Sequence, residues 1–443
     1  MNVKDYQPEK ALTPSASLKD VGSIREISSV EQSIKFDHGI EREAQGSAFL
    51  AFFNVVCVVA GMGALGLPNA LRQGGWMGLL ILGLSWIFST YSGIILVRSL
   101  YYNGQTRLSS YQEVAEAAFG RIGGWVAFFF TAVILIGVPV LYILLAGQNL
   151  HAVLKGTPGE LTFAIWTIIC AAIVAIPFLG VKSLKEIGIL SAFGMLATVV
   201  TVLIVIVKAL EQKGLNPAPH YDAVIWTQFP MALSTISFSF GGNPVYAHVE
   251  AGMRNPRNWN KVIISGLTTC VVLYFIAAVP GYYVYGDQSL SPVYDNLPDG
   301  PYKTAAAVIM TVHVILAAPI LMTSFALDLE KLFGITTFNH SRFVEYVLRF
   351  GVRGTILVVT TVIAIFVPFF GDFMALLGAF SNCALVFIFP VVFYYKLTGF
   401  RNKPFYELIL GFFVILMGIV GLIFGTKSAI EALRADFAGL NAK

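Results

Sequence analysis

Two glycine- and proline-rich stretches inside long apolar runs could do chemistry through their backbone. The first is Gly61-Met62-Gly63-Ala64, with Pro68 after it, and the second is Phe240-Gly241-Gly242-Asn243, followed by Pro244. Glycine costs about 1 kcal/mol of helix propensity and proline lacks an N–H donor, so a continuous helix is disfavoured in both places. In hydrocarbon, irregular backbone survives only inside protein or beside a wet cavity. Because free amides there can bind an anion and free carbonyls a cation, the two stretches predict a site for a zwitterion such as an amino acid.

Ionisable side chains are rare in the apolar runs, so each is a candidate for function. His313 lies midway along one run, and its imidazole titrates near neutral pH, so it could carry a proton. The alternative is a histidine that is hydrogen-bonded within a helix bundle. Glu250 lies at the end of another run, just before Arg254 and Arg257. A gating role and a structural pair with an arginine fit this glutamate equally well.

The composition indicates that membrane-spanning helices position these residues. Hydrophobic residues make up 56% of the 443 residues, charged residues only 12%, and the mean hydropathy is +0.75. This balance excludes an ordinary soluble domain. A helix needs roughly 20 apolar residues to cross the bilayer. The sequence predicts an all-α protein with eleven spans: 48–71, 76–101, 125–151, 161–179, 187–210, 226–249, 261–285, 302–327, 352–370, 373–397 and 405–425.

The loops predict the orientation of these spans. Most of the 29 lysine and arginine residues fall in the first 47 residues and in the loops on the same side of the membrane. Because cytoplasmic loops carry an excess of these residues, the amino terminus is expected inside. Residues 1–47 then form a disordered cytoplasmic tail, 48–425 the transmembrane transporter domain, and 426–443 a short extracytoplasmic tail.

The two interrupted spans are the first and the sixth. Because five spans is an odd number, these two cross the membrane in opposite directions. Spans one to five and six to ten would therefore be inverted repeats, with the eleventh span added. Such an arrangement brings both interruptions together near the bilayer midplane.

The residues at both interruptions resemble one known family. Gly61–Ala70 with Gly74–Trp76 is similar to the first-span signature of the amino acid/auxin permeases. Phe238–Pro244, followed by Glu250 and Met253, is similar to the sixth-span pattern of that family. Fungal neutral amino acid permeases show the resemblance most strongly. It implies a LeuT-type fold with a 5+5 inverted repeat, an extra helix, broken helices 1 and 6, and amino acid uptake driven by a cation gradient.

The resemblance also implies roles for individual residues. The backbone amides of Gly61, Met62, Gly63 and Ala64 would hold the substrate carboxylate. The carbonyls and amides of Phe240, Gly241, Gly242 and Asn243 would face its ammonium group and side chain. Tyr142, in the third span, is a candidate for lining the pocket, with packing as the alternative. Asn382, in the tenth span, is among the other side chains that could reach the midplane.

Two departures from the family's sodium-coupled members bear on the coupling ion. Those members carry an asparagine in the first span and a hydroxyl residue in the eighth, where this chain has Cys57 and Ala317. Thiol and methyl groups are poor ligands for a hard cation, which prefers oxygen. The sequence therefore predicts coupling to protons rather than sodium, although Thr323 and Ser324 could supply oxygens.

The prediction is a proton-coupled symporter that imports neutral L-amino acids by alternating access. The plasma membrane is the expected location, with the vacuolar membrane as the alternative; the partners are the substrate, the proton and the lipid bilayer. The alternative functions are an amino acid-sensing receptor of the same fold and a sodium-coupled symporter. The four cysteines show no metal-binding spacing, and no hydrolase or metalloprotease motif occurs, so no enzyme, metal or cofactor is expected. A net charge of +4 on so apolar a chain does not favour nucleic acid as a partner.

Overall fold

The computed structural model describes residues 46–104, 106–180, 188–212, 219–335, 341–401 and 403–441. The predicted cytoplasmic tail lies outside the described residues, except for its last two positions. Contacts divide the chain into two units. Of the smaller unit only Asn103, Gly104 and Thr106 are described, and the Asn103 side chain there accepts a hydrogen bond from the Thr106 amide at 3.1 Å. The larger unit, Ala44–Tyr102 with Arg107–Lys443, contains all the described helices.

Helices make up nearly all of the described part of the larger unit. The α-helices are α2 (Ala48–Val59), α3 (Gly63–Gly74), α4 (Met77–Leu100), α5 (Tyr111–Val153), α6 (Phe163–Gly180), α7 (Gly188–Glu211), α8 (Phe229–Ser239), α9 (Asn243–Ala251), α10 (Trp259–Tyr285), α11 (Pro301–Leu332), α12 (Arg342–Phe366), α13 (Phe370–Leu377), α14 (Phe389–Thr398), α15 (Phe405–Val420) and α16 (Thr426–Asn441). Two π-helices connect neighbouring α-helices: η5 (Gly378–Ile388) lies between α13 and α14, and η6 (Gly421–Gly425) lies between α15 and α16. Short 3₁₀ helices lie in connections: η2 (Pro256–Asn258), η3 (Gly286–Gln288) and η4 (Val293–Asn296).

Within the described residues, eight helical segments are long and apolar enough to cross a membrane. The number rises to nine if α2 and α3, which meet at an angle of 47°, form one span. The protein is therefore an all-helical membrane protein, whereas the predicted number of eleven spans remains a prediction. One boundary differs clearly, because the ninth predicted span begins at Val352 and α12 begins at Arg342. Ser341 caps this helix by accepting a hydrogen bond from the Val344 amide.

The backbone is interrupted at both glycine-rich stretches. Helix α2 ends at Val59 and α3 begins at Gly63, and in the same way α8 ends at Ser239 and α9 begins at Asn243. The ends of the two interruptions lie against each other, since a Cβ atom added to Gly63 would lie 2.6 Å from the Cα atom of Ser239. Only glycine permits this contact, so the packing of α3 on α8 explains why a residue that disfavours helix occurs here.

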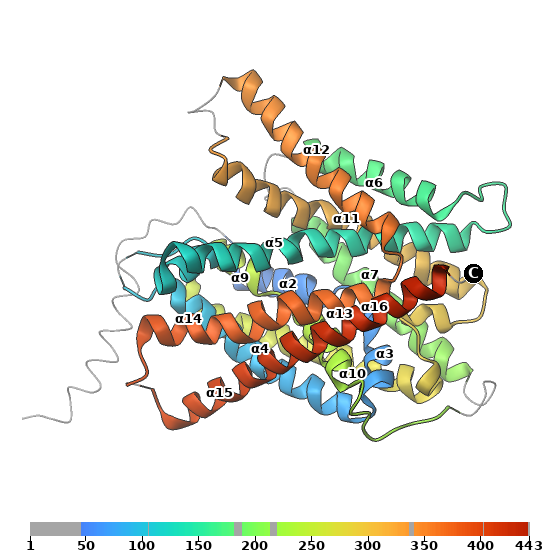
Figure 1. The fold of residues 1–443 in the computed structure, drawn as a ribbon, viewed down its shortest axis with the longest axis horizontal. Helices are drawn as coiled ribbons and strands as arrows, with labels where there is room; N and C mark the ends of the chain where they lie inside the picture. The colour runs from blue at the N-terminus through green and yellow to red at the C-terminus, as the bar shows by residue number, and fades with distance from the viewer. Residues whose placement is uncertain are drawn as a thin grey trace, which may run out of the picture. The chain divides into compact units, whose positions relative to one another are not determined.

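Two pairs of long helices pack against each other elsewhere in the unit. Helix α11 packs along α5, and α12 packs against α6, as Figure 1 shows. Helix α5 is bent near its start, because Gly120 adopts a φ of 68° that separates a first short helical segment from the long one. The largest cluster of buried apolar residues contains residues of both interruptions together with residues of α5 and α11. The interruptions therefore lie in the packed interior of the helical unit.

The chain stays helical beyond the last predicted span. Residues 426–443 were expected to form a short tail, but α16 extends from Thr426 to Asn441 and packs against α13. The Phe437 ring meets the Phe369 ring edge-on, with 4.9 Å between the ring centroids. The apolar run ends at Gly425 while the helix does not, because α16 is amphipathic and buries one face on α13.

Candidate functional site

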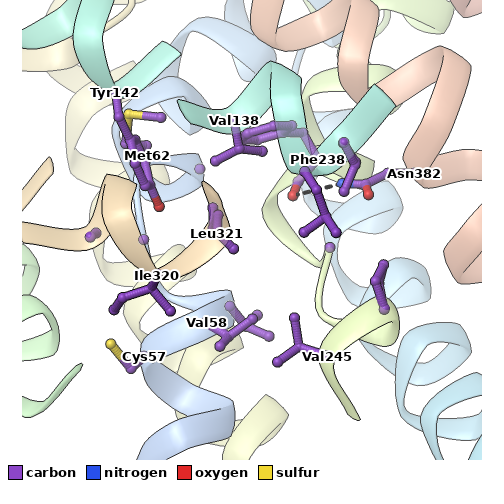
Figure 2. A pocket seen from close by; sticks show the side chains of 18 of the residues that line it. Cys57, Val58, Met62, Val138, Tyr142, Phe238, Val245, Ile320, Leu321 and Asn382 are labelled. Atoms are coloured by element: carbon purple, nitrogen blue, oxygen red, sulfur yellow. Dashed lines mark hydrogen bonds between the residues drawn. The ribbon is translucent and has the colours of Figure 1, made fainter. Parts of the chain in front are cut away.

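A cavity of about 100 Å³ lies between the two interruptions. Its lining comes from α2, α5, α8, α9, α11 and η5 and from both interrupted stretches (Figure 2). Most of the wall is aliphatic, and the polar side chains that reach it are those of Cys57, Tyr142, His313 and Asn382. No aspartate, glutamate, lysine or arginine lines this cavity in the part of the chain that the structure describes.

The cavity brings together some of the residues that the sequence singles out and leaves others outside. Those that line it are Cys57, Gly61, Met62, Gly63, Tyr142, Gly241, His313 and Ala317. Those that do not are Ala64, Phe240, Gly242, Asn243 and Glu250.

The first interruption leaves backbone donors available. Across the described residues, the amides of Gly61, Met62 and Gly63 have no hydrogen-bond acceptor, whereas the Ala64 amide donates to the Gly61 carbonyl at 3.4 Å. These three amides precede or begin α3, and the amino-terminal end of a helix attracts negative charge. The arrangement can bind a carboxylate without any cationic side chain. Tyr142 lies beside it, since a Cβ atom on Gly61 would lie 3.7 Å from the tyrosine hydroxyl.

At the second interruption, two side chains point into the protein rather than into the cavity. The Phe240 ring is fully buried and meets the Tyr274 ring edge-on, with 5.3 Å between the centroids. The Asn243 side chain donates to the Ser92 hydroxyl at 2.7 Å and to the Leu385 carbonyl at 3.2 Å. Both side chains therefore position the interrupted backbone.

A tyrosine that the sequence did not indicate connects the two interruptions. The Tyr274 hydroxyl of α10 lies 2.6 Å from the Val59 carbonyl oxygen, at the end of α2. It also contacts the Ser239 carbonyl oxygen, at the end of α8. A hydroxyl has one proton, so it donates to one of these carbonyls at a time. No local sequence pattern links Tyr274 to either stretch, and only the fold brings them together.

His313 lies at the cavity wall with its ring nitrogens unpaired. Its side chain is 3% exposed, and neither nitrogen has a hydrogen-bond partner among the described residues. Its ring lies 6.4 Å from that of Tyr142, centroid to centroid. A Cβ atom on Gly194 of α7 would lie 2.6 Å from the imidazole and 3.5 Å from the Cys57 sulfur. Gly194, which the sequence did not indicate, therefore makes room for His313 beside Cys57.

Glu250 lies away from the cavity in a buried ion pair. Its carboxylate accepts hydrogen bonds from the Arg107 Nε atom at 2.8 Å and from the Tyr101 hydroxyl at 2.6 Å. Arg107, which precedes α5, is thus a partner of Glu250 that the sequence did not indicate. Arg107 also donates to the Ala247 carbonyl, so it holds the last turn of α9 through two groups.

Asn382 contributes a polar side chain from the π-helix η5. Its Nδ2 atom donates to the Phe238 carbonyl oxygen at 3.2 Å (Figure 2). A Cβ atom on Gly241 would lie 2.2 Å from Nδ2, so only glycine at this position allows the carboxamide to pack directly against the backbone of the second interruption.

A second and wider cavity of about 670 Å³ opens at the other end of α3. Its lining includes Arg72, Lys303, Asp372 and Asp436, so it is charged where the cavity between the interruptions is apolar. Arg72 donates to the Ser289 carbonyl at 3.1 Å. The contribution of Asp436 shows that α16 forms part of the wall of this wider cavity.

Comparisons with known proteins agree with this architecture. The chain is 27% identical to "Amino acid transporter AVT1I" of Arabidopsis thaliana, over 88% of this chain and 97% of the relative. It is 25% identical to "Vesicular inhibitory amino acid transporter" of Xenopus laevis, over 98% of this chain and 84% of the relative. Both relatives are named as transporters and neither as an enzyme.

Solved transporters share the fold. The structure of MhsT in complex with L-phenylalanine matches with a TM-score of 0.58 and 15% identity, covering 87% of this chain and all of that one. Mhp1, a nucleobase-cation-symport-1 family transporter, matches with a TM-score of 0.53 and 14% identity, covering 88% of this chain and 93% of that one. These likenesses establish a LeuT-type fold.

The sequence model described as "Transmembrane amino acid transporter protein" matches residues 44–431, which is most of the chain. The resemblance seen in the two glycine-rich stretches is thereby confirmed. The chain belongs to this family of amino acid transporters, the amino acid/auxin permeases.

Proposed function

We propose that this protein is a secondary active transporter that imports neutral L-amino acids together with protons by alternating access. The observation that carries the proposal is the cavity between the two interruptions. It offers the unpaired amides of Gly61, Met62 and Gly63 to a carboxylate, within walls that are mostly aliphatic and carry no charged side chain among the described residues. The Ala64 amide and the backbone of Phe240, Gly242 and Asn243 do not line the cavity and would support the residues that do.

The preference for neutral substrates follows from the lining. A charged substrate side chain would leave water and meet no opposite charge, because no acidic or basic residue lines the described cavity. Burying an unpaired charge is far more costly than burying an apolar group. Aliphatic residues such as Val138, Ile320 and Leu321 instead offer favourable contacts to an apolar substrate side chain.

Three features support protons as the coupling ion. His313 presents unpaired nitrogens at the cavity wall. Cys57 and Ala317 offer no oxygen ligands from their side chains. The carbonyl oxygens that end α2 and α8 are already contacted by the Tyr274 hydroxyl, which leaves them less available to sodium.

We further propose eleven spans. The described set would be completed by α7 and by the pair α8 and α9, giving inverted repeats of five spans and one additional helix. The packing of the third span, α5, on the eighth, α11, supports the repeat, because both occupy the same position in their halves. The amino terminus would face the cytoplasm and the carboxyl terminus the outside, at the plasma membrane or, alternatively, the vacuole.

Uptake into proteoliposomes tests this function. The purified protein should accumulate a radiolabelled neutral amino acid when the outside is more acidic than the inside. A protonophore should abolish the accumulation, and replacing sodium with choline should leave it unchanged. Binding without accumulation would indicate a receptor instead, and strict dependence on sodium would overturn the assignment of the ion.

A further inference from the structure

We propose that Asn382 recognises the ammonium group of the substrate and that its carboxamide oxygen is the specificity-determining acceptor. The inference rests on the proposed function, because it requires an α-amino acid in the cavity between the interruptions. It assigns a substrate-binding role to the tenth predicted span. The substrate contacts implied by the resemblance lie instead in the first, third and sixth spans.

The position of Asn382 suits a substrate contact. The side chain is 2% exposed and lines the cavity from η5, an eleven-residue π-helix. Segments of π-helix are rare and are frequent at functional sites, because they redirect side chains that a regular α-helix would aim elsewhere. In Figure 2, Asn382 lies beside Phe238, across the cavity from Tyr142.

The orientation of the carboxamide follows from its one hydrogen bond. The Phe238 carbonyl oxygen can only accept, so the atom that faces it at 3.2 Å is the amide nitrogen. The Oδ1 atom therefore points elsewhere. It is buried and has no hydrogen-bond partner in the part of the chain that the structure describes. A buried acceptor without a partner is costly in the absence of a ligand, and a ligand with an N–H donor would satisfy it.

Four neighbouring backbone acceptors are already engaged. The carbonyls of Val59 and Ser239 contact the Tyr274 hydroxyl, and the Phe240 carbonyl accepts from the Gly242 amide. The Phe238 carbonyl accepts from Asn382 itself and from the Gly241 amide. With the substrate carboxylate on the amides of Gly61, Met62 and Gly63, the ammonium group needs an acceptor, and the buried Oδ1 atom of Asn382 has no partner among the described residues.

The test compares each amino acid with the same molecule lacking its amine. The pairs are alanine with propanoate, leucine with 4-methylpentanoate, and phenylalanine with 3-phenylpropanoate. Affinities are measured from the ligand-induced rise in melting temperature of the full-length protein in nanodiscs. The wild type should bind at least one amino acid about tenfold or more better than its des-amino partner, because the latter leaves a buried acceptor unpaired.

Asn382→Leu should reduce this ratio about tenfold, because leucine has a similar volume but no acceptor. Asn382→Asp keeps an acceptor oxygen and should retain the ratio, which protects the test if the leucine variant folds poorly. Asn149→Leu is the matched control: Asn149 is also buried and hydrogen-bonded, to Thr311, but it lines the wider cavity of about 670 Å³ instead. Its ratio should equal that of the wild type.

Two results would overturn the inference. One is an Asn382→Leu variant that binds both members of a pair more weakly by the same factor, since Asn382 would then only support the Phe238 carbonyl. The other is loss of the ratio in His313→Leu and its retention in Asn382→Leu, which would place the ammonium group at the histidine. Failure of the proposed function would look different, because the wild type would then bind no amino acid.

Discussion

Single residues control access to the backbone at the first interruption. Replacing Gly63 with leucine should abolish uptake, because even a Cβ atom would come within 2.6 Å of the Ser239 backbone and push α3 away from α8. Membrane insertion should persist, since leucine is more apolar than glycine. Gly83→Leu is the control, because a Cβ atom there meets nothing within 4 Å. Uptake by both variants, normalised to the amount in the membrane, checks the prediction; normal uptake by Gly63→Leu would contradict it.

The proton is also assigned to one residue. His313→Gln should remove the dependence of uptake on an imposed pH gradient, because glutamine does not titrate in the physiological range. Exchange of labelled for unlabelled substrate across proteoliposomes without a gradient should continue. Gly194→Ala should weaken the pH dependence similarly, since its Cβ atom would displace the imidazole. A His313→Gln variant that still accumulates substrate when the outside is acidic would place the proton on another group.

At the scale of elements, Tyr274 holds together two helix ends that are far apart in the sequence. Tyr274→Phe should lower the free energy of unfolding by about 1–3 kcal/mol, because the two buried carbonyls lose the one hydroxyl donor that they share. The melting temperature of the purified protein should fall accordingly, and uptake should fall with it. Tyr406→Phe provides the control, since that side chain is 75% exposed. Equal melting temperatures for the two variants would show that the hydroxyl contributes little.

The same contacts explain what the sequence could predict and what it could not. That the helices would stop near Gly61 and near Gly241 was predictable, because glycine and proline act on the local backbone. The direction of the Phe240 and Asn243 side chains was not, since it depends on Tyr274 and Ser92 in other helices. The start of α12 was missed for a related reason. Its first turns carry charges, and Arg349 pairs with Glu345 and with Glu330 of α11, so hydropathy alone placed the span too late.

In the whole molecule, alternating access requires the two sides of the cavity to open in turn. On the side that we propose is cytoplasmic, α9 is held at its end by two sets of contacts. Arg107 pairs with the fully buried Glu250, and the Gly46 backbone pairs with that of Gly252 and Arg254. Opening toward the cytoplasm would move α9 and break the ion pair. Under the proposed mechanism, we therefore expect the pair to stabilise the closed state of this side and to bias the equilibrium between the two states.

Removing one partner should shift that equilibrium. Arg107→Gln removes the guanidinium that pairs with the buried Glu250 carboxylate, and the loss of one partner of a buried ion pair destabilises the closed arrangement. We expect faster hydrogen exchange at the end of α9, and lower accumulation of substrate, because the site spends less time facing outward. The double variant Arg107→Gln with Glu250→Gln should recover part of both, since it also removes the buried carboxylate charge. If the pair only supports the fold, Arg107→Gln will melt at a lower temperature than the wild type. Well below the melting temperatures, hydrogen exchange at α9 will then be as slow in the variant as in the wild type.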